Sequence, residues 1–303
     1  MNHCISCALL SVCSAFSAVA FDEIPILTDE QVEFLRMTPE ERRFRFTNEQ
    51  YRARLAVAED RTKWRKAIPG EEGRFVHLPG IPNMRDLGGL VGLDGRRVRR
   101  HLIYRAGGFN NNAKYRDLPR EKWKPGSPRL TPETRAFQIR RLGIRTDLDL
   151  RNDQECFGMT ESPLGPQTVW AHIEGQPYKA FFSEKGRAAF AKAFRLFLDR
   201  RNYPIGFHCI AGADRTGSLA YVLLELLGVS DADVLLDWEL TAFQNPNHLF
   251  AHGPRYDELV KRFGRYPGSC SRERVEAFVR EQGFTDADIA AFRSIMLESS
   301  REN

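Results

Sequence analysis

The chain has 303 residues, of which 42% are hydrophobic, and it can therefore bury a substantial core in one large domain with an extension. Its 45 Lys and Arg residues against 40 Asp and Glu residues give a formal net charge of +5. This mild excess suits anionic ligands but does not indicate a nucleic-acid-binding protein, so no nucleic-acid partner is expected.

The first twenty residues contain no charged side chain, and residues 5–20 are apolar and rich in small residues. They end in Ala18-Val19-Ala20, which is typical of a signal-peptidase site. We therefore expect residues 1–20 to be a signal peptide, although it lacks the usual basic start. The mature chain would be periplasmic or secreted, without an integral membrane segment.

Residues 21–73 are predicted to form a helical N-terminal extension, because they contain three helix-start patterns. The main domain is predicted over residues 74–303. Within it, residues 110–130 form a basic insertion that either overhangs the functional site as a lid or is simply a solvated loop. Its cations are Lys114, Arg116, Arg120, Lys122, Lys124 and Arg129.

Strands and helices follow one another through the main domain. Apolar runs predict strands over 102–105 and 203–207, and helical patterns cover 131–143, 187–200 and 216–227. The C-terminal third is predicted to be helical, with helix starts at 231–233 and 285–288.

The most informative segment runs from His208 to Gly217 and reads His-Cys-Ile-Ala-Gly-Ala-Asp-Arg-Thr-Gly. A strand leads into it and a helix leads out of it, so loop N–H groups and the positive end of the helix point at one spot. An oxyanion would bind there above Cys209, with the Arg215 guanidinium across two of its oxygens. The residues predicted to bind phosphate are Ile210, Ala211, Gly212, Ala213, Asp214, Arg215 and Thr216.

This arrangement favours phosphoryl transfer through a cysteine nucleophile. A helix N-terminus and a nearby cation lower the pKa of a thiol, so Cys209 is expected to be ionised. It would attack a phosphomonoester and form a phosphocysteine, which water then hydrolyses. The Thr216 hydroxyl would donate to the departing sulfur. No cluster has convincing metal-ligand spacing, so neither a metal nor another cofactor is expected.

The leaving group needs a proton, and two carboxyl groups are candidates for the general acid. Asp214 lies inside the loop and is the nearer one, and neighbouring negative charge would keep it protonated. Glu174 lies ahead of the cysteine at about the distance of the mobile acid loop of many cysteine phosphatases. We favour Asp214 and keep Glu174 as the second choice.

With this loop, the chain resembles bacterial cysteine-dependent tyrosine/serine phosphatases, whose loop reads His-Cys-x-x-Gly-Lys-Asp-Arg-Thr-Gly. Three further segments match the family in order: 83–89 (Asn-Met-Arg-Asp-Leu-Gly-Gly), 102–107 (Leu-Ile-Tyr-Arg-Ala-Gly) and 147–151 (Asp-Leu-Asp-Leu-Arg) with Glu155 following. The resemblance covers residues 75–295. It implies an α/β fold like that of protein-tyrosine phosphatases, with a central, mostly parallel sheet flanked by helices.

The resemblance also frames the substrate and the residues around the loop. The family's loop lysine is Ala213 here, which argues against multiply phosphorylated inositol head groups. His208, Arg85 and Asp86 are expected to support the phosphate loop, with a solvated ion pair as the alternative for the last two. Arg105 ends a strand, and would face the same cleft because ligands bind beyond the carboxyl ends of parallel strands.

Signal-peptide cleavage would leave the cysteines Cys156, Cys209 and Cys270. An oxidising compartment exposes a reactive thiolate to oxidation. One hypothesis is that Cys156 forms a protective disulfide with Cys209, and the alternative is that Cys156 is an inert buried thiol.

Three functions are consistent with these observations. The first is a protein-tyrosine phosphatase, with possible activity on phosphoserine and phosphothreonine. The second is an inositol phosphate or phosphoinositide phosphatase that uses the same loop. The third is a pseudophosphatase that only binds phosphorylated ligands, which the intact Cys209 and Arg215 argue against. The expected partner is a phosphorylated protein or a small phosphomonoester.

Overall fold

The computed structural model describes residues 81–109, 132–156, 158–243 and 248–299. The predicted signal peptide (1–20), the predicted helical extension (21–73), the predicted domain start at 74 and the basic insertion (110–130) lie outside these residues, so they stay predictions. Within the described ranges, no helix combines the length and apolar character needed to cross a membrane.

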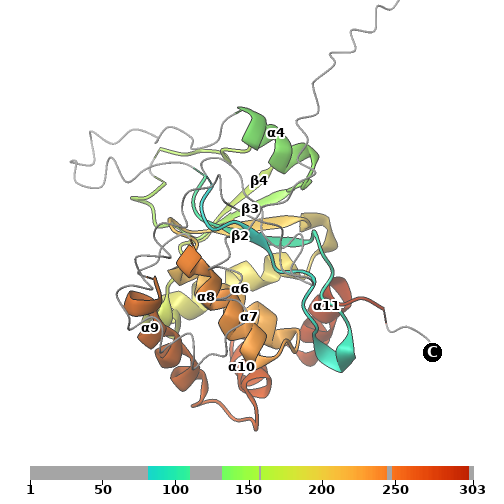
Figure 1. Cartoon of the computed structure of the whole chain (residues 1–303), viewed down its shortest axis with the longest axis vertical. Coiled ribbons are helices and arrows are strands. Elements are labelled where there is room, and N and C mark those ends of the chain that lie inside the picture. The colour runs from blue at the N-terminus through green and yellow to red at the C-terminus, as the bar shows by residue number, and fades with distance from the viewer. Residues whose placement is uncertain (1–80, 110–131, 157, 244–247, 300–303) are drawn as a thin grey trace, which may run out of the picture.

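A five-stranded sheet forms the centre of the domain (Figure 1). Its order is β1-β2-β5-β3-β4, with β1 antiparallel to β2 and the other neighbours parallel. This mostly parallel sheet confirms the expected fold class. The strands are β1 (Arg85–Asp86), β2 (Ile103–Ala106), β3 (Thr146–Asp149), β4 (Val169–His172) and β5 (Ile205–His208).

Helices flank the sheet unequally. In Figure 1, α4 (Pro132–Arg140) lies on one side of the strands, whereas the helices from α6 onward lie on the other. The latter group gives the domain its thick helical layer. The members of this layer are α6 (Glu184–Phe197), α7 (Asp214–Leu226), α8 (Asp231–Glu239), α9 (His248–Phe263), α10 (Ser271–Glu281) and α11 (Asp286–Met296). The short α5 (Tyr178–Phe181) precedes them in the chain.

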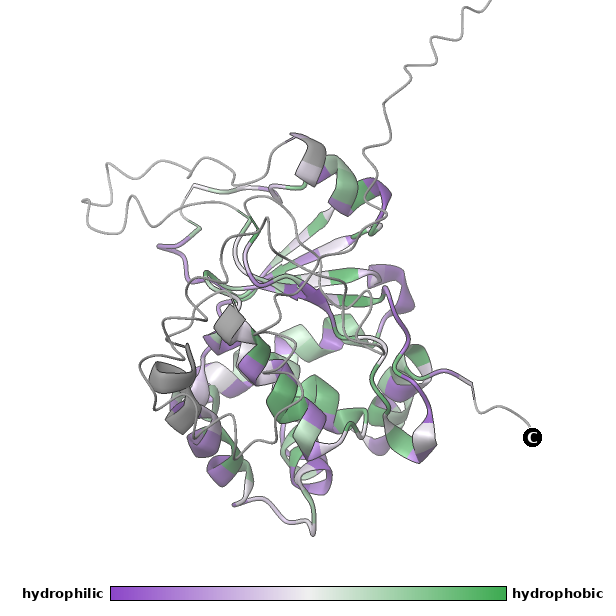
Figure 2. Cartoon of the chain, viewed as in Figure 1, coloured by the Kyte–Doolittle hydropathy of each residue, from purple (hydrophilic) through white to green (hydrophobic). Residues whose placement is uncertain are grey.

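Helix α7 is the centre of the core. Every residue from Thr216 to Leu226 is buried, and the helix contacts β2, β5, α8 and α10. Figure 2 accordingly shows a largely hydrophobic helix at this position. Because it is buried along this length, α7 lies between the sheet and the neighbouring helices.

Most predicted helices are confirmed with small shifts of their ends. Helix α6 begins after Ser183, whose hydroxyl accepts from Gly186 N–H, and α11 begins with a capping box at Thr285. Helix α7 begins at Asp214, two residues earlier than expected. Asp214 and Arg215 therefore lie in its first turn.

The loop between β5 and α7 requires glycine at position 212. Gly212 has φ +68°, and a Cβ there would lie 2.6 Å from the carbonyl carbon and oxygen of Ala106. The neighbouring strand β2 thus packs directly against the loop. Because Ala106 and Asp149 both pair with His208, the ends of β2, β3 and β5 are level where the loop begins.

Candidate active site

Cys209 follows the last residue of β5 and is only 2% exposed. Burial by itself raises the pKa of a thiol. The Arg215 guanidinium, the Thr216 hydroxyl and N–H, and the Gly212 N–H favour the thiolate, and together they hold the pKa of Cys209 below its ordinary value. The buried Thr216 Oγ1 has no nitrogen or oxygen partner among the described residues, so the sulfur is the acceptor left to it.

The loop after Cys209 turns three successive carbonyl groups away from the sulfur. Ile210 O accepts from Gly108 N–H (2.9 Å), Ala211 O from Asn83 Nδ2 (3.3 Å), and Gly212 O from Asn83 Nδ2 (3.0 Å). In a trans peptide the N–H points opposite to the C=O. The N–H groups of residues 211, 212 and 213 therefore face the inside of the loop, as in an anion-binding nest.

Arg215 is held by one edge of its guanidinium. Nη1 and Nη2 donate to the two carboxylate oxygens of Glu155 at 2.5 and 3.0 Å, and Nη1 also donates to Leu150 O (3.3 Å). Nε makes no hydrogen bond within the part of the chain that the structure describes. The edge formed by Nε and the second Nη2 hydrogen is thus free for an oxyanion, while Glu155 fixes the opposite edge.

The two candidate acids lie in different surroundings. Asp214, in the first turn of α7, accepts a short hydrogen bond from the Tyr178 hydroxyl. Glu174 follows β4 and pairs with Lys185 Nζ of α6 (2.7 Å), with its side chain 30% exposed. Asp214 is adjacent in sequence to Arg215, which is predicted to bind phosphate, whereas the ion pair directs Glu174 toward α6.

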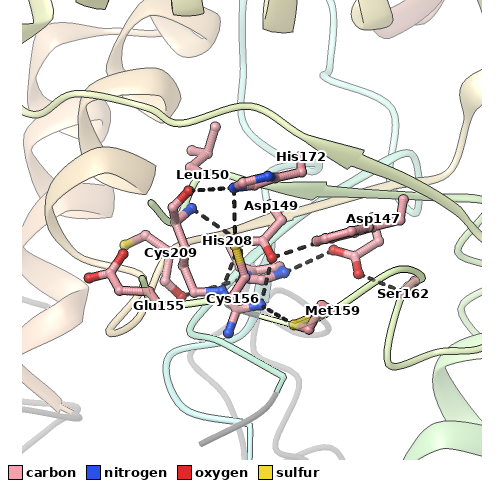
Figure 3. Close-up of polar contacts among 12 residues, drawn as sticks. Asp147, Asp149, Leu150, Glu155, Cys156, Met159, Ser162, His172, His208 and Cys209 are labelled. Atoms are coloured by element: carbon pink, nitrogen blue, oxygen red, sulfur yellow. Dashed lines mark hydrogen bonds and ion pairs between the residues drawn. The ribbon is translucent and has the colours of Figure 1, made fainter. Parts of the chain in front are cut away.

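His208 is anchored beneath the loop by two carboxylates (Figure 3). Its Nε2 lies 2.8 Å from Asp147 Oδ1, and its Nδ1 lies 3.8 Å from Asp149 Oδ1. Asp147 also accepts from Ser162 Oγ (2.6 Å). Burial lowers the pKa of His208, but the two carboxylates outweigh it and raise the pKa above its ordinary value. The strand end thus favours an imidazolium one residue before Cys209.

Arg85, expected to support the phosphate loop, is buried and does not form a solvated ion pair with Asp86. Arg105, expected to face the cleft, is buried as well. Arg105 Nη2 donates to Gly212 O (2.8 Å), so it contacts the outer side of the loop. Both guanidinium groups pair with Asp237 of α8.

The Asp86 carboxylate lies at the turn after β1, and its predicted support of the phosphate loop stays a prediction. Its carboxylate oxygens accept from the N–H groups of Gly88 and His101, both at 2.8 Å. These bonds fix the turn after β1 against the chain that leads into β2.

Cys156 and Cys209 are both free thiols in the structure. Cys156 Sγ lies 3.1 Å from Asn152 O and 3.1 Å from His172 Nε2 (Figure 3). Burial and, next, the charge of Asp149 raise the pKa of Cys156 to about 12. These contacts fit the inert buried thiol, and the protective disulfide stays a prediction.

Residues of this site that were not identified from the sequence as functional include Asn83, Tyr178 and Asp237. Asn83 belongs to a matched motif, which gave a signal of its importance. Asp237 lies on the same helical face as the buried Val234 and Trp238, and an acid on an apolar face indicates a buried partner. Tyr178 carried no signal in the sequence.

The site combines a buried cysteine with a lowered pKa, inward N–H groups, and an arginine whose guanidinium is bound along one edge only. On an α/β scaffold, this is a candidate cysteine-centred oxyanion site. Comparison with known protein families supports this assignment. The model of the tyrosine phosphatase family matches residues 76–120 and 126–263, and the chain belongs to this family.

A protein of Cupriavidus necator named as a tyrosine-protein phosphatase is 28% identical over 182 residues. The match covers 52% of this chain and 59% of that protein's length. Among solved structures, the core catalytic domain of the PP-IP phosphatase SIW14 from S. cerevisiae, in complex with citrate, is similar with a TM-score of 0.35 and 15% identity. That match covers 66% of this chain and 96% of the other.

Proposed function

We propose that this chain is a phosphomonoester hydrolase that acts through a phosphocysteine intermediate. The assignment that fits best is a protein-tyrosine phosphatase, and the substrate panel described below tests whether it also accepts phosphoserine and phosphothreonine. The observation that carries the proposal is the environment of Cys209. Its pKa is lowered despite complete burial, because Arg215, Thr216 and Gly212 all favour the thiolate.

In the first step the Cys209 thiolate attacks phosphorus, so an S–P bond forms while the P–O bond to the leaving group breaks. The free edge of Arg215 and the inward N–H groups of residues 211–213 stabilise charge on the equatorial oxygens. Asp214 gives its proton to the leaving alkoxide or phenolate. Glu174 remains the second choice for this proton transfer.

In the second step water attacks the phosphocysteine, and Asp214 takes the proton from that water. The S–P bond breaks, inorganic phosphate leaves, and the thiolate is regenerated. The Thr216 hydroxyl, with the sulfur as its remaining acceptor, stabilises the departing thiolate.

The substrate class follows from family membership and from position 213. A cation there would add charge for several phosphate groups, but the residue is alanine. A single phosphate on a protein side chain is therefore the favoured substrate, with phosphotyrosine first.

Hydrolysis of an aryl phosphate tests the proposal. Activity should persist in a chelator, be inhibited by vanadate, and be lost in Cys209→Ser. Cys270→Ser is the matched control, because Cys270 is exposed and distant in sequence from the loop, and it should retain full activity. Survival of turnover in Cys209→Ser would remove the proposed mechanism.

A substrate panel then separates the specificities. Phosphotyrosine, phosphoserine and phosphothreonine peptides should be compared with inositol phosphates by kcat/KM. A preference for inositol phosphates would replace the protein-phosphatase assignment without affecting the chemistry at Cys209.

A further inference from the structure

The carbonyl groups of Ala211 and Gly212 are held by side chains from outside the phosphate loop. Asn83 Nδ2 donates to both carbonyls, and Arg105 Nη2 donates to Gly212 O at 2.8 Å. Because each peptide is planar and trans, a carbonyl held outward keeps the next N–H pointing inward. These donors therefore decide where the N–H groups of residues 212 and 213 point.

Arg105 and Asn83 are both connected to the Asp237 carboxylate, Arg105 directly and Asn83 through Arg85. Asp237 Oδ2 accepts a short hydrogen bond from Arg105 Nη1, and Asp237 Oδ1 accepts from Arg85 Nε at 2.8 Å. Arg85 Nη2 also donates to the Asp237 carbonyl at 2.5 Å. One residue of α8 thus holds both guanidinium groups by its side chain and one of them by its backbone as well.

Arg85 in turn orients Asn83. Arg85 Nη1 donates a short hydrogen bond to Asn83 Oδ1. With its oxygen engaged on that side, the Asn83 amide presents its NH2 group to the loop carbonyls. Two routes therefore run from Asp237 to the loop, one through Arg105 and the other through Arg85 and Asn83.

The network is deeply buried, which makes its geometry costly to disturb. Arg85 is 0% exposed, and Arg105 and Asp237 are each 1% exposed. A guanidinium without a partner in such surroundings is strongly unfavourable. With Asp237 in place, both arginines have one defined position, and so do the carbonyls that Arg105 and Asn83 hold.

We propose that Asp237 is a positioning residue of the phosphate loop, which aims the N–H groups of Gly212 and Ala213 at the sulfur and the phosphate by holding Arg105, Arg85 and Asn83. This inference rests on the proposed function, because it assigns a role at the same loop. Asp237 acts through Arg105, Arg85 and Asn83, which hold the loop from its outer side.

The direction in which the pKa of Cys209 shifts in Asp237→Asn distinguishes a positioning role from a purely electrostatic effect. Asp237→Asn removes a negative charge near the loop, and electrostatics alone would then lower the pKa of Cys209. Loss of positioning has the opposite effect, because the Gly212 N–H no longer points firmly at the sulfur. A purely structural role would lower the melting temperature and leave the pKa of the thiol unchanged.

The experiment is the rate of Cys209 alkylation by iodoacetate as a function of pH, measured on the full chain. We expect the midpoint in Asp237→Asn to rise by about one pH unit, which corresponds to about a tenfold smaller thiolate fraction below the midpoint. Inhibition by vanadate should weaken by a similar factor. Val234→Ala, a buried residue of the same helix, is the control for lost stability and should leave the midpoint unchanged.

Asn83→Gly provides a second route if Asp237→Asn does not fold. Asn83 has φ +58°, which glycine adopts readily, so this variant removes the amide without straining the backbone. Its midpoint should also rise, and in a double variant the two shifts should not add, because both act through the same carbonyls.

The outcomes distinguish this inference from the proposed function. An ordinary thiol midpoint in the unmodified protein would overturn the proposed function and this inference with it. A lowered midpoint there, combined with an unchanged or lowered midpoint in Asp237→Asn, would overturn the positioning role alone. If Asp237→Asn cannot be prepared, an unchanged midpoint in Asn83→Gly has the same meaning.

Discussion

Replacing Glu155 by glutamine tests how the guanidinium of Arg215 is kept in place. In the structure both Glu155 oxygens accept from Arg215, at 2.5 and 3.0 Å. Glutamine retains the shape but has one acceptor oxygen, and its NH2 group would face the guanidinium. One of the two hydrogen bonds is lost, and the other becomes neutral on the acceptor side.

The size of the effect follows from these bonds and their exposure. A hydrogen bond to a charged group contributes about 1.5–3 kcal/mol and a neutral one about 0.5–1.5 kcal/mol. The two side chains are 15% and 17% exposed, so solvent partly screens the pair. We expect a net loss of about 1–2 kcal/mol in the positioning of Arg215, which lowers kcat/KM by about 5- to 30-fold.

The assay is steady-state hydrolysis of an aryl phosphate, with the inhibition constant of vanadate measured beside it. Glu281→Gln is the control, because it removes an exposed pair with Arg187 on the helical layer and should leave both values unchanged. If Glu155 instead competes with phosphate for Arg215, the variant would bind vanadate more tightly. Tighter binding, or an unchanged kcat/KM, would refute the positioning argument.

Three further predictions concern titrating groups. The pKa of Cys209 is lowered, so the rate of alkylation should reach its half-maximal value at a lower pH than for an ordinary thiol. A midpoint at the ordinary pKa of a thiol would contradict this. Tyr178→Phe removes the hydrogen bond that holds the Asp214 carboxyl group in place, so kcat/KM should fall more for an aryl phosphate with a poor leaving group than for one with a good leaving group, and equal losses would exclude Asp214 as the acid. Burial and, next, Asp231 raise the pKa of Glu225 from 4.5 to about 8. Between these two values, Glu225 keeps its proton in the folded chain and loses it in the unfolded chain. The free energy of unfolding therefore decreases as the pH rises from 4.5 to 8, by at most about 5 kcal/mol. Thermal melts should show Glu225→Gln gaining stability over the unmodified protein at pH 9 and hardly at pH 5; equal gains would contradict the shift.

Local sequence was sufficient for the central strand, the loop and the helix that follows. Cys209 and Arg215 lie six positions apart within one segment, and the strand and helix on either side leave the loop little freedom. Gly212 is needed where β2 packs against this loop, and a glycine at that point was part of the motif. The family resemblance extended this to the whole sheet, whose mostly parallel order the structure confirms.

The surroundings of the loop could be anticipated only in part. Arg85 and Arg105 were expected near the site, yet the sequence placed Arg105 in the cleft, whereas it contacts the loop from its outer side. Arg85 and Asp86 belong to the same matched block, but successive strand residues point to opposite faces, so their side chains have different partners. The Asp86 carboxylate accordingly fixes a turn.

By itself, the sequence predicted which atoms would react, because Cys209, Arg215 and the start of a helix lie within ten residues and are joined by short covalent connections. Only the tertiary structure decided which side chains hold Arg215 and the loop in position. Glu155 reaches Arg215 across 60 positions and Asp237 reaches Arg85 across 152. Such pairs depend on how α7 packs against the sheet and how α8 packs against α7, and buried polar groups select their partners only when that packing removes water.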